Sequence, residues 1–121
     1  MPGDRRLCSA YLAAMHVLAK PWNGMLIAVL EGGPLRFSAI AARVPAIGDR
    51  MLTARLKELE ERRLLVRRVD PGPPVRVSYE LTDAGRAFRE VAEAIERWGR
   101  TIERAQQTAA PKVRAKTRRS A

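Results

Sequence analysis

The most regular pattern of apolar and polar positions lies between residues 48 and 65, where apolar residues recur at helical spacing. Leu52, Leu56 and Leu59 fall on one side of a helix drawn through this segment. The pattern predicts an amphipathic helix that packs on a core through its leucines and presents a mainly basic surface to solvent. That opposite surface carries Arg50, Ala54, Lys57 and Glu61.

Helical spacing also predicts three shorter helices ahead of this segment. The first spans residues 9 to 20, with Ser9 as its cap, and the second spans residues 22 to 31. The third is expected to be capped by Ser38 and to end at a tight connection around Pro45. Two helices joined by a short turn, with a basic second helix, are the parts of a helix-turn-helix.

Two strand-like segments follow the basic helix. Residues 64–69 are short and contain β-branched side chains, and residues 75–81 alternate apolar and polar positions as a half-buried strand does. The Asp70-Pro-Gly-Pro-Pro74 linker between them predicts a hairpin with a stiff tip. We therefore predict a mainly α fold with a small β-hairpin, a winged helix-turn-helix of the kind that reads duplex DNA.

A long helix is expected after Thr82, which has the chemistry of an N-terminal cap. Its apolar positions repeat every three or four residues, yet they come after the compact unit is complete. An apolar stripe in this place needs a partner, and a second copy of the chain is the economical one, with the N-terminal helix alongside. The predicted dimer interface consists of Tyr11, Leu12, Met15, Phe88, Val91, Ile95, Trp98 and Ile102.

The charge of the chain narrows the class of partner. A formal net charge of +10 and 46% hydrophobic residues describe a basic globular protein that is attracted to nucleic acid. We expect one domain over residues 1–110 and a basic, disordered tail over residues 111–121. An alternative is a basic RNA- or ribosome-associated protein without sequence-specific DNA binding. Only 5% of the residues are aromatic, which disfavours this alternative because single-stranded RNA is bound largely by stacking of its bases on aromatic side chains.

Other chemistry is sparse in this sequence. The single cysteine, Cys8, cannot form a disulfide within the chain, so a reducing cytoplasm is expected. Cys8 is interpreted as a small buried apolar residue or, alternatively, as a redox sensor. We expect no enzyme, metal or cofactor, because one histidine, one cysteine and no Gly-rich phosphate loop supply no such site. No apolar run approaches the roughly 20 residues that span a membrane.

Five segments follow one another along the chain: Lys20-Pro-Trp-Asn-Gly24, Gly33-Pro-Leu-Arg-Phe-Ser38, Asp49 to Leu59, Pro74 to Gly85, and Trp98-Gly99. In this order and spacing they resemble the HxlR family of bacterial winged-helix transcription regulators. The resemblance implies a homodimer that binds a roughly palindromic site, and a small-molecule or electrophile effector. Some members sense electrophiles through an N-terminal cysteine near the position of Cys8. The sequence departs from the family at Gly48, where a capping serine is usual, and at Ser9, where proline commonly follows the cysteine.

Within this arrangement the basic helix supplies the base-reading residues. Arg50 is placed to pair with guanine, Thr53 to bond a base or touch a thymine methyl, and Lys57 to contact a phosphate. Arg55 lies closer to the core and is expected to pair with a carboxylate instead. An ordinary solvated helix surface is the alternative for this face. The full set of predicted DNA-binding residues is Arg36, Ser38, Asp49, Arg50, Thr53, Ala54, Lys57, Arg67, Arg68 and Arg76.

Overall fold

A computed structural model describes the backbone of residues 8–118 and the side chains of residues 8–108. The chain divides into two units, Met1–Arg89 and Glu90–Ala121. In order, the elements are helix α1 (Ser9–Ala19), α2 (Asn23–Val29), the 3-10 turn η2 (Leu30–Gly32), strand β1 (Leu35–Arg36), α3 (Phe37–Arg43), the 3-10 turn η3 (Pro45–Ile47), α4 (Asp49–Glu61), β2 (Leu65–Asp70), β3 (Arg76–Leu81), α5 (Asp83–Arg86) and α6 (Phe88–Arg118).

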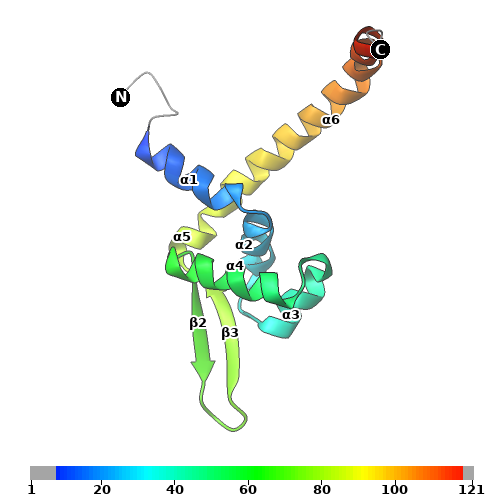
Figure 1. Cartoon of the computed structure of the whole chain (residues 1–121). Coiled ribbons are helices and arrows are strands. Elements are labelled where there is room, and N and C mark those ends of the chain that lie inside the picture. Colours follow the sequence, from blue (N-terminus) through cyan, green and yellow to red (C-terminus); the bar gives the residue numbers. More distant parts are fainter. Residues whose placement is uncertain (1–7, 119–121) are drawn as a thin grey trace. The chain divides into compact units, whose positions relative to one another are not determined.

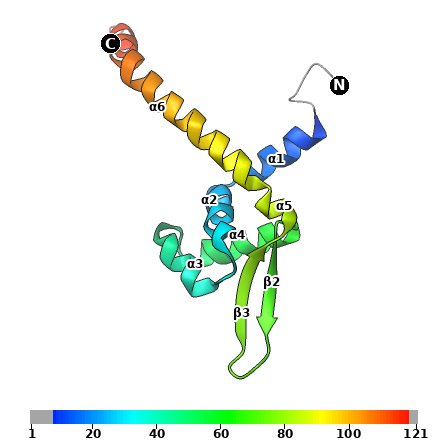
Figure 2. The ribbon, with the colours of Figure 1, turned by 180° about the vertical axis from the view of Figure 1, so that it is seen from behind.

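The first unit has one apolar core, and α4 supplies a large part of it. Its three leucines at positions 52, 56 and 59 are at most 1% exposed, as the helical pattern predicted. The β2–β3 hairpin extends away from the helices of this unit (Figures 1 and 2). The buried core consists of Leu26, Ile27, Leu30, Ile40, Val44, Ile47, Leu52, Leu56, Leu59, Leu65 and Leu81.

The sheet has three antiparallel strands in the order β1-β3-β2. Both long strands of the hairpin were predicted, whereas β1 was not, because two residues are too short to show an alternating pattern. Leu35 pairs with Tyr79 and Arg36 with Ser78, so β1 docks the start of α3 against the hairpin. The sheet therefore connects the helix-turn-helix to the β2–β3 hairpin, which is the wing of this fold.

The helix caps differ from the prediction at two serines. Cys8, not Ser9, is the N-cap residue of α1, and it forms no side-chain cap hydrogen bond. Ser38 is the second residue of α3, whose N-cap residue is Arg36. The prediction was wrong at Ser38 because Arg36 is held by its pairing with Ser78, so the chain passes from strand into helix before the serine.

The C-terminal helix is interrupted near its start. Thr82 caps α5 as predicted, and its hydroxyl accepts a hydrogen bond from the backbone N–H of Gly85 at 3.1 Å. The helix breaks at Ala87, however, and α6 begins at Phe88. The backbone of α6 then remains helical to Arg118, whereas the side chains of residues 109–118 and all of residues 119–121 lie outside the described part. The disordered tail expected over residues 111–121 stays a prediction.

In the part of the chain that the structure describes, no single helix is both long and apolar enough to cross a bilayer, and one pair, Ser9–Ala19 with Asn23–Gly32, reaches the required length and composition but is bent by 86°.

The end of α4 has a strained residue. Arg63 adopts φ 63°, and the N–H groups of Arg63 and Leu64 donate to the carbonyls of Glu60 and Leu59. This is a Schellman ending, in which the left-handed position favours glycine. We expect Arg63→Gly to raise the free energy of unfolding by about 1 kcal/mol, since a non-glycine residue is strained in this region. Urea denaturation would measure it; a decrease, as expected for a control Arg62→Gly at φ −84°, would contradict the assignment.

Candidate nucleic-acid interface

The outward face of α4 is exposed and unpaired. Arg50, Ala54 and Lys57 are all exposed, and neither cation forms an ion pair within the described residues. Thr53 lies beside them, and its hydroxyl donates to the carbonyl oxygen of Asp49 at 2.9 Å. The face therefore offers two free cations to a ligand, as the sequence predicted.

The N-terminus of α4 starts from an unusual backbone conformation. Gly48 has φ 79° and ψ 152°, a combination open essentially to glycine alone. A capping serine in this conformation would be strained, which explains why glycine stands here. Because no side chain caps the helix, its first N–H groups remain available to water or to phosphate oxygens.

Two other cations, one in α4 and one at its C-cap, are paired with Glu58 and are therefore less available to a ligand than the two cations of the outward face. The Glu58 carboxylate lies 2.8 Å from Arg55, 3.5 Å from Arg62 and 3.7 Å from Lys20. The predicted pairing of Arg55 with a neighbouring carboxylate is confirmed, and the side chain is only 16% exposed. Because Lys20 belongs to the connection between α1 and α2, this cluster also links α4 to that connection.

The arginines of the wing do not act as one group. Register places Arg67 opposite Tyr79, and Arg68 opposite Ser78. Because side chains alternate along a strand, Arg67 and Arg68 point to opposite faces of the hairpin. Arg68 is hydrogen-bonded to Glu80, and Arg76 lies on the same face as Arg68, opposite Asp70.

This division predicts unequal effects of the two wing arginines. We expect Arg67→Ala to weaken duplex binding evenly across sequences and to lower the slope of log K against log salt by about one per subunit. Arg68→Ala should change that slope by less than half as much, because Glu80 already balances its charge. Fluorescence anisotropy over a salt series would measure both variants, and equal slopes would refute the difference.

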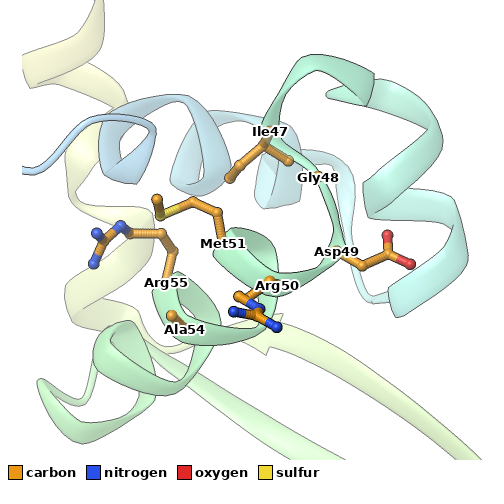
Figure 3. A pocket seen from close by; sticks show the side chains of 7 residues that line it. All are labelled: Ile47, Gly48, Asp49, Arg50, Met51, Ala54 and Arg55. Carbon is orange, nitrogen blue, oxygen red and sulfur yellow. The ribbon is translucent and has the colours of Figure 1, made fainter.

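A shallow, open hollow of about 540 Å³ borders the N-terminal half of α4. Met51 and Arg55 point to one side of the helix, whereas Asp49 points to the other (Figure 3). Its lining is mostly apolar apart from charged groups at the edge. The lining residues are Ile47, Gly48, Asp49, Arg50, Met51, Ala54 and Arg55.

The basic helix α4, the short helix α3 before it and the hairpin after it all lie within the range of one family model. The HxlR-like helix-turn-helix family model covers residues 17–107. The chain belongs to this family. It is a DNA-binding transcription regulator of the winged helix-turn-helix type, like the relatives described next.

Several relatives support this membership. The HTH-type transcriptional regulator YodB of Bacillus subtilis is 41% identical over 92 residues, which are 76% of this chain and 82% of YodB. A regulator of Methanothermobacter thermautotrophicus is 40% identical over 100 residues, 83% of this chain and 76% of that protein. The solved structure of reduced YodB superimposes with a TM-score of 0.72 at 39% identity, covering 87% of this chain and 97% of that one. Reduced HypR gives 0.74 at 29% identity, covering 83% and 99%.

The predicted interface residues of this HxlR-like chain fall into two environments. Those of α1 and most of those of α6 are exposed, and Trp98 is the most exposed at 66%. Phe88 differs, because it is half-buried against the core of the first unit and lies next to Gly24. The exposed members are Tyr11, Leu12, Met15, Val91, Ile95 and Trp98, with Ile102 half-buried.

Cys8 is exposed at the N-terminus of α1. The interpretation of Cys8 as a buried apolar residue is therefore wrong, because the first turns of α1 contribute no buried side chain. Among the described residues, no group of three histidine, cysteine or acidic side chains could hold a metal ion.

Proposed function

We propose that the chain binds palindromic operators in the cytoplasm as a homodimer joined through α1 and α6. Two α4 helices would enter successive major grooves about 34–36 Å apart. The observation that carries this proposal is the exposed, unpaired Arg50 and Lys57 on the side of α4 opposite its buried leucines. The exposed apolar side chains of α1 and α6 support a self-complementary interface.

Six of the predicted DNA-binding residues have a stated role in this proposal. Arg50 pairs with guanine O6 and N7, and Asp49 accepts from a cytosine amino group. Lys57 and Arg67 contact phosphates and fix the register of the protein on the duplex. Around the start of α3, the side chains of Arg36 and Ser38 are exposed and add further phosphate contacts.

Selection of bound sequences from a random duplex pool tests the proposal. We expect an inverted repeat whose half-sites lie about one helical turn apart, and a binding stoichiometry of two chains per duplex. Excess single-stranded RNA should not displace this duplex. Enrichment of no sequence, together with displacement by RNA, would favour the alternative of a general RNA-binding protein.

We also propose that Cys8 makes this regulator responsive to electrophiles. The support is its exposure at the N-terminus of α1, and the relative YodB, which has been solved in quinone-bound and diamide-treated forms. A quinone would form a carbon–sulfur bond with Cys8 while the thiol proton passes to the quinone oxygen. Diamide takes two electrons and two protons from two thiols, so a chain with one cysteine would give a disulfide between two copies or with a small thiol.

The response is testable with one substitution. We expect quinone to lower operator affinity of the wild-type protein at least tenfold and to leave Cys8→Ser unchanged, because only the thiol reacts. Anisotropy titration and intact-mass measurement would follow affinity and adduct together. An unmodified protein that still releases DNA, or a modified protein that still binds it, would refute the thiol switch.

A further inference from the structure

The hollow beside α4 exposes apolar side chains on the N-terminal half of a helix whose outward face is otherwise mainly charged. Its lining includes Ile47, Met51 and Ala54, and Met51 remains 37% exposed. This surface lies on the half of the helix that a major groove would receive. Base pairs display one apolar group in that groove, the C5-methyl of thymine.

We propose that this hollow receives a thymine methyl, which makes Met51 and Ala54 specificity-determining residues. This inference rests on the proposed operator binding and adds the identity of a base to it. Ala54 lies one helical turn after Arg50, and both border the hollow. The thymine should therefore neighbour the guanine that Arg50 contacts in each half-site.

The charges around the hollow favour a base over a phosphate. Asp49 borders the hollow, but its carboxylate points to the opposite side of α4 from Met51 (Figure 3). Arg55, which also borders the hollow, is already bound to Glu58 at 2.8 Å. Arg50 is thus the free cation at the edge, and the remaining surface suits an uncharged group.

Thr53 is the competing reader of a thymine methyl. Its hydroxyl is held by the carbonyl oxygen of Asp49, which leaves the methyl group for an apolar contact. Thr53 does not line the hollow. Removing either methyl-contacting side chain therefore distinguishes the two assignments.

Replacing thymine by deoxyuridine removes only the C5-methyl and tests the proposal. In the duplex selected by the wild-type protein, each thymine is replaced in turn and the dissociation constant is measured by anisotropy. We expect one thymine per half-site, next to the Arg50 guanine, at which replacement weakens binding about fourfold, the effect of burying one methyl group. Replacing it in both half-sites should weaken binding about fifteenfold, if the half-sites are independent.

Substitutions assign the effect to the hollow. In Met51→Ala the ratio between the thymine and deoxyuridine duplexes should fall below twofold, whereas Met51→Leu should preserve it. Met25→Ala is the matched control, since Met25 is 52% exposed in α2 and does not line the hollow, and it should leave the ratio at fourfold. Circular dichroism would confirm that each variant is folded.

Each other result would overturn the proposal. A ratio that survives Met51→Ala but collapses in Thr53→Ser assigns the methyl to Thr53. Ratios below twofold at every thymine, with an operator clearly selected, reject methyl recognition and leave the proposed function intact. A pool from which no sequence is enriched rejects the proposed function itself, and with it this inference.

Discussion

Arg50→Ala is expected to lower operator affinity by roughly 30-fold to 10⁴-fold and to abolish the preference for guanine at one position of each half-site. A bidentate arginine–guanine contact contributes about 1–3 kcal/mol of discrimination, and a dimer would lose two such contacts. The structure supports this assignment because Arg50 is exposed in the first turn of α4 and has no acidic partner in the described chain that would have to be displaced. Anisotropy with four duplexes that differ only at that position would measure it.

Two variants separate base reading from loss of charge. Lys57→Ala removes the same charge from the same helix, and it should weaken binding to all four duplexes by a similar factor. Arg100→Ala removes an exposed cation from α6 and should change affinity by less than threefold. If Arg50→Ala weakens the four duplexes equally, then Arg50 contacts the backbone and the base reader lies elsewhere on α4.

The sequence predicted α4 well because its physical signal is local and redundant. Leu52, Leu56 and Leu59 repeat at the helical period, and one helix satisfies all three burial requirements at once. The exposed positions of Arg50 and Lys57 then follow from geometry. The same logic predicted the hairpin, whose alternating positions and Pro-rich linker need no tertiary information.

Features that depend on contacts across the chain were not predictable. The α3 helix starts before Ser38 because Arg36 of β1 pairs with Ser78, which lies 40 positions after Ser38 in the sequence. The wing arginines looked equivalent until the register with β3 placed Arg68 next to Glu80. The hollow that Met51 borders is also lined by Ile47 of η3, and no periodicity in the sequence marks it.

A second feature of this kind joins α4 to the β2–β3 hairpin and to α5. The hydroxyl of Thr82 donates to the carbonyl of Arg63 at 2.8 Å and accepts from the N–H of Gly85. The N–H of Thr82 donates to the carbonyl of Leu64 at 3.1 Å. Gly85 is buried, and its Cα lies directly against the Leu64 backbone. The end of α4, the start of β2 and α5 are therefore held together by these hydrogen bonds and by a backbone contact that leaves no space for a side chain at position 85.

Gly85→Ala is accordingly expected to lower the free energy of unfolding by about 3 kcal/mol or more and the Tm by about 10 °C or more. A Cβ at this position would overlap the carbonyl oxygen of Leu64 and approach Leu81 Cδ2 to 3.0 Å. Relief requires α5 to move, which breaks the Thr82 hydrogen bonds and releases the wing from α4. Thermal denaturation at a fixed chain concentration would measure the effect, because the proposed dimerisation would make Tm depend on concentration. Gly32→Ala is the matched control, since a Cβ there meets nothing within 4 Å, and its Tm should stay within about 3 °C of the wild type. A Gly85→Ala protein as stable as this control would show that α5 does not rest on the β2 backbone.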